Sequence, residues 1–306
     1  MGFPDPAVIR HSDGYWYAYV TGGGVARSTN LVTWAWQPAY TASGGFNWGT
    51  QGALPWAPDV VRIGGQYVLY YSLSIWGDTN PGIGIATAPA PTGPWTDRGK
   101  LFRSTEIGVE NSIDPAVFTA QDGRVFMVWG SFRGNYMIEL SADGLALKEP
   151  ANAAGSKTLI AGAPIGQAMG SAYEGMYVLF RNGYYYLFAS IGRCCQGATS
   201  TYSVVVLRST SPTGPYVDRL GRSALALAEL GEPVVRGDGT RFVGPGHNSI
   251  AIDDGGNWWL VYHSYAYSNP ALDRRELMID KLTWDMDGWP SVANPGNAPS
   301  QYPFPP

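Results

Sequence analysis

The chain has 306 residues, of which 45% are hydrophobic and only 14% are charged. With a formal net charge of −4 and no basic run, it has no electrostatic footprint for nucleic acid. No stretch approaches the roughly 18 consecutive apolar residues of a membrane span. We therefore expect neither a nucleic acid nor a membrane as a partner. Aromatic residues reach 13%, which suits a neutral, polyhydroxylated ligand whose apolar faces pack on rings. Any secreted β protein could share this composition.

One pattern recurs along the whole chain: an ionisable residue, a short apolar run, a glycine turn and an aromatic-rich run. Its five copies open at Asp5, Asp59, Asp114, Glu174 and His247. The opening residue precedes its turn glycine by nine positions in four copies and by six in the Asp59 copy. Successive openings lie 54, 55, 60 and 73 positions apart, which is long for a solenoid and fits four-stranded propeller blades. We therefore predict an all-β fold, a five-bladed β-propeller.

In chain order, each predicted blade continues from its opening hairpin into weaker strands. These continuations cover residues 25–36, 82–99, 136–144, 201–221 and 276–292. Helix signals are almost absent, and 40 Gly and 23 Pro punctuate the strand-like runs. We expect a single propeller domain over residues 1–293 and a Pro-rich tail over 294–306, which either packs on the surface or begins a linker.

The two cysteines, Cys194 and Cys195, are adjacent in the sequence. Neighbouring cysteines can bridge only through a strained eight-membered ring, and the chain contains no other cysteine as a partner. Two buried or half-buried thiols are therefore the first expectation. A vicinal disulfide, or a position on the wall of a cleft, is the alternative.

In a propeller, the five opening residues would lie at the entrance of the innermost strands, beside the central axis. Four carboxylates and one imidazole would then face one axial cavity. Like charges at short range cost free energy, so a folded protein seldom gathers carboxylates without using them. An Asp-Pro pair at a strand start is often only a turn or a backbone cap. Acids at equivalent positions of several repeats point instead to a functional site.

The segments that carry these acids resemble the five-bladed propeller glycoside hydrolases of family 43. They are DPAVIR, WAPDVV, SIDPAVF, YEGMYV, GPGHNSI and WDMDGWP, spread over residues 3–289. Within that family, the stretch SIGRCCQGATSTYSVVVLRS at 190–209 is similar to the arabinanases, which cleave α-1,5-linked arabinan. The resemblance implies an inverting hydrolase with Asp5 as general base, Glu174 as general acid and Asp114 as the third acid.

Glycoside cleavage needs one carboxylic acid to protonate the leaving oxygen and one carboxylate to act on water or on the anomeric carbon. In an inverting enzyme the two groups lie roughly 6.5–9.5 Å apart, which leaves room for the water. We expect the charge of Asp114 to raise the pKa of Glu174 and keep it protonated near neutral pH. Asp59 stands in the same register, but its hairpin is shorter and the resemblance assigns catalysis to the other acids. We expect Asp59 to be structural.

Four further residues are expected to contact the sugar. Trp56 could stack on a sugar ring at the cleft wall, with core packing as an equally weighted alternative. Ser131 and Phe132 match a segment that lines the sugar pocket of the family, although Phe132 would also suit a core. Cys194 belongs to the stretch that is similar to arabinanases.

His247 is one of three histidines. A lone histidine is usually a hydrogen-bonded core residue, and calcium prefers oxygen ligands. The arabinanases that this chain resembles nevertheless hold a metal ion, commonly calcium, at the propeller centre through such a histidine and waters. We therefore expect calcium or another metal ion near His247, which could also hold the catalytic carboxylates in place.

The predicted activity is hydrolysis of α-1,5-L-arabinofuranosidic bonds in linear arabinan and arabino-oligosaccharides, with endo action favoured over exo action. The alternatives are α-L-arabinofuranosidase or β-xylosidase activity on the same fold, and a non-catalytic carbohydrate-binding propeller. We expect a monomer that is secreted or periplasmic, with its signal peptide missing from this sequence.

Overall fold

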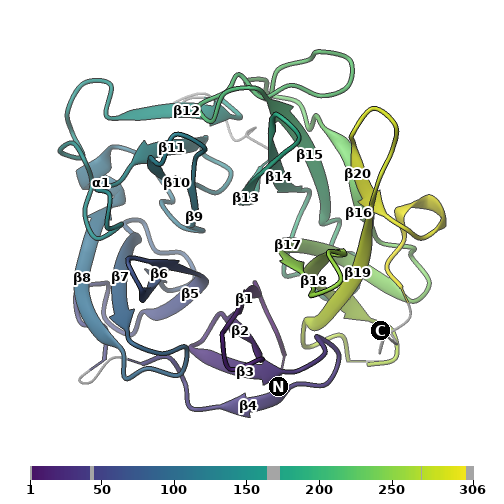
Figure 1. Cartoon of the computed structure of the whole chain (residues 1–306), viewed down its shortest axis with the longest axis horizontal. Coiled ribbons are helices and arrows are strands. Elements are labelled where there is room, and N and C mark those ends of the chain that lie inside the picture. Colours follow the sequence, from purple (N-terminus) through teal and green to yellow (C-terminus); the bar gives the residue numbers. More distant parts are fainter. Residues whose placement is uncertain (1, 42–44, 164–172, 270, 301–306) are drawn as a thin grey trace.

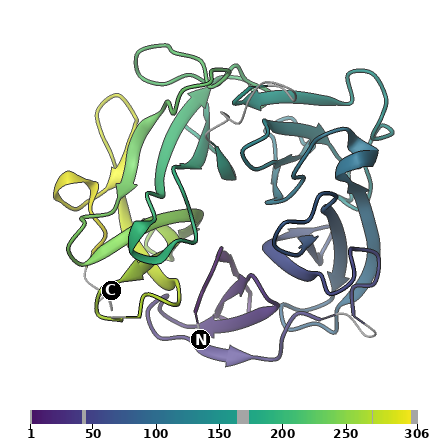
Figure 2. The same cartoon turned by 180° about the vertical axis from the view of Figure 1, so that it is seen from behind.

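The computed structural model describes residues 2–41, 45–163, 173–269 and 271–300. Within these ranges, the strands form five antiparallel sheets of four, and every sheet follows the chain order. Figures 1 and 2 show the sheets arranged as blades around a central axis, with β1, β5, β9, β13 and β17 innermost. The predicted five-bladed β-propeller is confirmed.

Each blade is a meander that starts at the axis and ends at the rim. Blades 1 to 3 comprise β1 (Ala7–Arg10), β2 (Trp16–Val20), β3 (Gly24–Ser28), β4 (Ala35–Gln37); β5 (Leu54–Ile63), β6 (Gln66–Ser74), β7 (Gly82–Ala88), β8 (Thr96–Arg103); and β9 (Ala116–Thr119), β10 (Val125–Trp129), β11 (Asn135–Glu139), β12 (Lys157–Ala161). Blades 4 and 5 comprise β13 (Glu174–Arg181), β14 (Tyr184–Ile191), β15 (Ser203–Ser209), β16 (Glu232–Arg236); and β17 (Phe242–Ile252), β18 (Trp258–Ala266), β19 (Glu276–Trp284), β20 (Pro290–Val292). Short helical turns are α1 (Ser104–Ile107), η1 (Gly197–Thr199) and η2 (Pro295–Asn297).

The second strand of a blade is buried on both faces, which explains its aromatic-rich sequence. In β2, Trp16 packs toward blade 5, whereas Tyr17 and Tyr19 pack toward blade 2. Because side chains alternate along a strand, each face of the sheet meets a different neighbouring blade. The core is accordingly divided into five clusters of described residues, one for each seam between adjacent blades.

Glycines close the inner hairpins, as the repeat predicted. Gly14, Gly123, Gly183 and Gly256 have φ values of 88°, 85°, 84° and 75°. Other residues rarely adopt this left-handed region, so the glycine sets the point at which each inner strand turns back.

The first part of the C-terminal tail is attached to blade 5. Asn294 donates a hydrogen bond to the buried carboxylate of Asp280 on β19 at 2.7 Å, and the backbone N–H of Ser300 donates to the same group. Residues 301–306 of the predicted tail lie outside the described residues. Among the described residues, no helix has the length and apolar character needed to cross a membrane.

Candidate active site

Near the start of the inner strand of every blade, one residue has a left-handed backbone, with φ between 40° and 61°. Each of these residues also donates its backbone N–H to a side chain of the preceding blade. The pairs are Asp5 with Nδ1 of His263, Ala57 with Oγ1 of Thr21, Asp114 with Oγ of Ser72, Gly175 with Oδ2 of Asp114, and His247 with Oγ of Ser190. These five positions are therefore structurally equivalent.

The predicted register of the opening residues is correct in three blades and wrong in two. Asp5, Asp114 and His247 occupy the left-handed position, but blade 2 places Ala57 there and blade 4 places Gly175. Glu174 lies one residue earlier and Asp59 two residues later. The reason is the length of the hairpin turn. The turn has two residues in blades 2 and 4, between Ile63 and Gln66 and between Arg181 and Tyr184, but five in blades 1, 3 and 5, so counting back nine positions from the turn glycine misplaces the opening residue.

Asp59 is buried, and its carboxylate bridges two blades. Its Oδ2 accepts the backbone N–H of Val117 on β9 at 2.6 Å. Burial raises the pKa of Asp59 to about 7, opposed by the N–H groups of Val117 and Val60. Asp59 does not line the larger pocket, and its bond to Val117 joins β5 to β9, which agrees with the structural role expected for it.

Asp5 is held in its charged form. Its Oδ1 accepts a hydrogen bond from Nη1 of Arg275 at 2.8 Å, and its Oδ2 accepts one from the hydroxyl of Thr21 at 2.6 Å. Burial by itself would raise the pKa of Asp5, but the charge of Arg275, then His247 and His263, and the Thr21 hydroxyl together hold that pKa well below its usual range. Asp5 is thus held as a carboxylate.

Two histidines face Asp5. Nδ1 of His247 lies 3.5 Å and Nδ1 of His263 lies 3.4 Å from Asp5 Oδ1. Burial lowers the pKa of both rings, and Asp5 only partly opposes this. Both are therefore neutral near pH 7, and Nδ1 of His263 is free to accept the backbone N–H of Asp5 at 3.1 Å.

The pKa values of Glu174 and Asp114 are raised, in contrast to that of Asp5. Burial is the leading cause that raises the pKa of Glu174; Ser131 and Tyr202 oppose it through hydrogen bonds, and the charge of Asp5 adds to it. Burial, followed by repulsion from Glu174 and Asp5, raises the pKa of Asp114 well above its usual range. The expected cause, the charge of Asp114, is not among the leading influences on the pKa of Glu174; the charge that adds to burial is that of Asp5. The neighbouring acids retain a proton because water is excluded.

A pocket of about 850 Å³ borders this group of acids at Glu174. Glu174 lines it, and so do all four residues predicted to contact the sugar: Trp56, Ser131, Phe132 and Cys194. Ser131 donates its hydroxyl to Oε2 of Glu174 at 2.7 Å, so the pocket wall and the acid are directly joined. The exposed Trp76 extends the aromatic wall beside Trp56, with ring centroids 6.5 Å apart.

Sequence reasoning missed the residues that hold the acids. Arg275 lies between the blade 5 strands β18 and β19, and no motif marks it. His263 sits in the aromatic run of β18, and its ring stacks on that of Tyr202, with centroids 5.8 Å apart. Tyr202 lies within the stretch that resembles arabinanases, so a signal for it existed, although its contact with Glu174 could not be read from the sequence.

The structure corrects the first expectation for the cysteines. Cys194 and Cys195 form a vicinal disulfide rather than two thiols. Cys195 has a left-handed backbone, with φ of 69°, and both residues line the pocket.

A metal ion at His247 would depend mostly on water. Among the described residues, no three His, Cys, Asp or Glu side chains form a group that could hold a metal. The next residue, Asn248, is 3% exposed, and its Nδ2 and Oδ1 have no hydrogen-bond partner within the described part of the chain. Buried amides of this kind are usually satisfied by ordered water. The donor set fits a hydrated cation rather than one enclosed by the protein.

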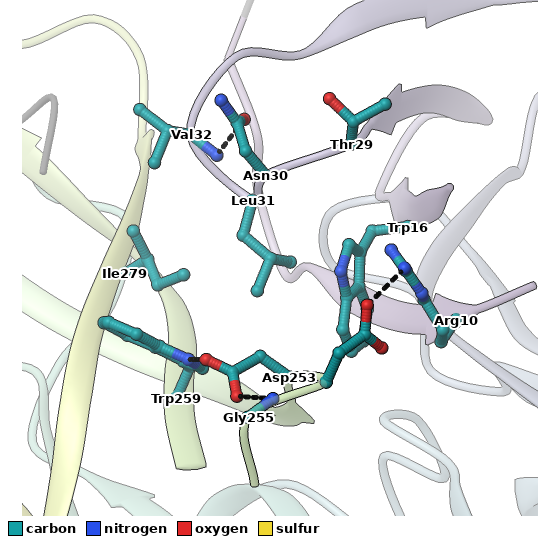
Figure 3. A pocket seen from close by; sticks show the side chains of 11 residues that line it. Arg10, Trp16, Thr29, Asn30, Leu31, Val32, Asp253, Gly255, Trp259 and Ile279 are labelled. Atoms are coloured by element: carbon teal, nitrogen blue, oxygen red, sulfur yellow. Dashed lines mark hydrogen bonds and ion pairs between the residues drawn. The ribbon is translucent and has the colours of Figure 1, made fainter. Parts of the chain in front are cut away.

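A second, smaller pocket of about 290 Å³ lies at the seam between blades 1 and 5 (Figure 3). Trp16, Leu31 and Ile279 form its apolar interior, and Arg10 at its rim pairs with Asp254 at 3.0 Å. Asp254 is exposed, whereas Glu174 in the larger pocket is buried. The larger pocket is therefore the better candidate for an active site.

Several known proteins are similar to this chain in sequence and in fold. Residues 1–290 match the family model described as glycosyl hydrolases family 43. The chain is 34% identical to the extracellular endo-α-(1→5)-L-arabinanase 1 of Bacillus subtilis, over 94% of this chain and 86% of that protein. It is also 34% identical to the extracellular exo-α-(1→5)-L-arabinofuranosidase ArbA of Cellvibrio japonicus, over 94% of this chain and 85% of that protein.

Among solved structures, the α-L-arabinanase of Cellvibrio cellulosa in complex with arabinohexaose superimposes with a TM-score of 0.82 at 31% identity, covering 95% of both chains. Sequence and fold thus agree over almost the full length. The chain belongs to family 43 of the glycosyl hydrolases and is arabinanase-like.

Proposed function

We propose that this chain hydrolyses α-1,5-L-arabinofuranosidic bonds of arabinan, with inversion at the anomeric carbon. One observation carries the proposal: three neighbouring buried carboxyl groups, one of which lines the larger pocket, have pKa values displaced in opposite directions. Asp5 is held charged, whereas Glu174 and Asp114 favour the protonated form. A pair displaced in this way supplies a base and an acid at the same pH. The α-(1→5) linkage is that named for the relatives.

In the proposed reaction, Asp5 accepts a proton from the attacking water while Glu174 donates its proton to the leaving glycosidic oxygen. Asp114 holds the acid in place, because its Oδ2 accepts the N–H of Gly175, the residue after Glu174, at 3.3 Å. Trp56, Phe132, Ser131 and Cys194 contact the sugar from the pocket wall.

Endo action is the first choice and exo action the second. The two named relatives, one endo-acting and one exo-acting, are equally identical to this chain, at 34%. The test is product analysis on linear α-1,5-arabinan, with wild type beside Glu174→Ala and Asp5→Ala. A ladder of oligomers from wild type and none from the variants supports an endo enzyme that uses these acids. A single short product from the start would move the proposal to exo action.

Stereochemistry and substrate class are tested in the same samples. Proton NMR of the first product should show the β-anomer before mutarotation, as inversion requires; the α-anomer would contradict the roles given to Asp5 and Glu174. If arabinan is untouched and an aryl-xyloside is cleaved, the arabinan assignment fails and the glycosidase chemistry stands.

We further propose a hydrated divalent cation, with calcium the expected ion, beside His247. Its neutral ring and the orphaned amide of Asn248 are the observations that favour it. A bound cation would supply positive charge near the carboxylates. Removal by a chelator should lower the thermal midpoint of unfolding, with recovery on adding calcium. His247→Ala should abolish that response, and a chelator without effect on wild type would refute the proposal.

We also propose that the enzyme is a secreted monomer. The two named relatives are described as extracellular. Light scattering coupled to size exclusion tests the monomer, and fractionation of cells that express the full gene tests the location.

A further inference from the structure

The Cys194–Cys195 disulfide lies in a loop that is held firmly at its neck. The loop follows β14, and Arg193 and Thr201 pair across its base: the N–H of Arg193 donates to Oγ1 of Thr201 at 2.9 Å, and the N–H of Thr201 donates to the carbonyl of Arg193 at 3.0 Å. The disulfide therefore sits at a fixed place in the pocket wall.

The sulfur of Cys194 contacts the two groups that hold Asp5. It lies 3.6 Å from Nη1 of Arg275 and 3.9 Å from Nε2 of His263. The same Nη1 donates to Asp5 Oδ1, and Nδ1 of His263 accepts the N–H of Asp5. Because Nδ1 accepts, the ring proton of His263 is on Nε2 and faces the sulfur. Cys194 is thus an acceptor for both partners of the proposed base.

The oxidation state of Cys194 determines how strongly its sulfur accepts a hydrogen bond. In a disulfide the sulfur is uncharged, has no proton to lose and is only a weak acceptor. A free thiol titrates with a pKa of about 8.5, lower beside an arginine. Its thiolate would compete with Asp5 for Arg275. Opening the disulfide would also free the Cys194 side chain to leave its place.

We propose that the Cys194–Cys195 disulfide is a positioning element for Asp5, and that a dithiol reductant weakens the reaction by opening it. The inference rests on the proposed function, since it needs Asp5 to be the base. In the chemical step, two electrons and two protons pass from the dithiol to the S–S bond. The protein gains two thiols, and the reductant becomes a cyclic disulfide.

The first measurement is alkylation with and without dithiothreitol, read by mass spectrometry. The untreated protein should take up no label and the reduced protein two labels, because the chain has two cysteines. Label on the untreated protein would overturn the proposal at once.

Activity is then measured on arabinan. Reduction of wild type should lower kcat about tenfold with KM little changed, below the roughly 10²-fold that a 1 Å misplacement of a catalytic group can cost. The acidic limb of kcat/KM should move to higher pH, since Asp5 loses part of its hold on Arg275. A reduced enzyme with unchanged kcat and pH profile would overturn the proposal.

The double variant Cys194→Ser/Cys195→Ser is the matched control. It should resemble reduced wild type and be insensitive to reductant, with circular dichroism showing that it is folded. If the reductant lowers kcat in this variant as well, it acts elsewhere and the proposal fails.

A spectroscopic arm separates this inference from the proposed function. In ¹H–¹⁵N spectra of the histidine rings, reduction should shift the Nε2–H signal of His263 whether or not arabinan is the substrate. If the oxidised wild type is inactive on arabinan but the signal still shifts on reduction, the proposed function is refuted while the contact between Cys194 and His263 is supported. An active enzyme with no shift refutes the inference.

Discussion

At the scale of single residues, Arg275 sets the charge of Asp5. Its guanidinium is the largest of the influences that lower the pKa of this buried carboxyl group, against the effect of burial. Arg275→Met should therefore raise the pKa of Asp5, and the acidic limb of kcat/KM should move up by about 1 pH unit or more. Arg193→Met, on the wall of the same pocket, is the control whose acidic limb should stay in place. An unmoved limb in Arg275→Met would contradict the role of Asp5 as base.

Tyr202 acts on the acid in the opposite sense. Its hydroxyl bonds to Glu174 and favours the charged form, which lowers a pKa that burial raises. Tyr202→Phe should raise the pKa of Glu174 further, so the alkaline limb of the rate profile should move to higher pH. Tyr216→Phe removes a buried hydroxyl that donates to the Pro212 carbonyl and should leave the limb unchanged. A shift toward lower pH would show that Glu174 is not the titrating acid.

These residues show what the sequence could predict at this scale. Asp5, Asp114 and Glu174 were identifiable because each opens a repeat. Arg275 belongs to no repeat, and it reaches Asp5 only because blade 5 closes beside blade 1, although the two residues are 270 positions apart in the chain. Its position depends on ring closure, which local patterns do not encode.

At the scale of elements, the register of β5 separates a structural acid from the catalytic candidates, because Asp59 lies two residues beyond the left-handed Ala57. The sequence contained a signal of this difference. Asp59 precedes its turn glycine, Gly65, by only six positions, whereas the opening residue precedes the glycine by nine in the other four copies. The hairpin is indeed shorter, with two residues in its turn where blades 1, 3 and 5 have five. The burial of Asp59 could not be inferred from that difference, because the count does not show what the carboxylate contacts. In the fold Asp59 lies against β9, where it accepts the backbone N–H of Val117.

Asp59 should make stability depend on pH. Its pKa rises from 3.8 in the unfolded chain to about 7 in the fold, so the folded state binds the extra proton between these values. Stability from this group is complete below about pH 4 and is lost as pH rises to about 7, on the order of 4 kcal/mol. Asp59→Asn keeps an acceptor for Val117 and removes the titration.

The measurement is urea unfolding of wild type and Asp59→Asn at pH 5 and pH 8. The variant should gain stability relative to wild type at pH 8, while its activity on arabinan stays near that of wild type. Equal pH dependence in the two proteins would show that Asp59 is charged in the fold. A large loss of kcat would return Asp59 to the catalytic candidates.

At the scale of the whole molecule, the repeat predicted the number of blades because every blade needs the same hairpin and the same doubly buried second strand. The repeat did not show how the C-terminal tail is attached to the last blade. The buried Asp280 of β19 provides part of this attachment. Its carboxylate accepts the hydroxyl of Tyr262 at 2.5 Å, Nδ2 of Asn294 at 2.7 Å and the backbone N–H of Ser300 at 3.1 Å. Blade 5 and the tail residues up to 300 are thereby joined.

Asp280→Ala should therefore destabilise the propeller although it lies outside the pocket. The change leaves donors from Tyr262, Asn294 and Ser300 without their acceptor, and each buried unsatisfied group costs about 1–3 kcal/mol. We expect the free energy of unfolding to fall by about 3 kcal/mol, measured in urea, with kcat unchanged for the folded enzyme. The control Asp122→Ala, which removes an exposed acid paired with Arg124, should leave the free energy of unfolding nearly unchanged. If Asp280→Ala costs no more than this control, the tail contributes little and the propeller domain ends near residue 293, as the sequence predicts.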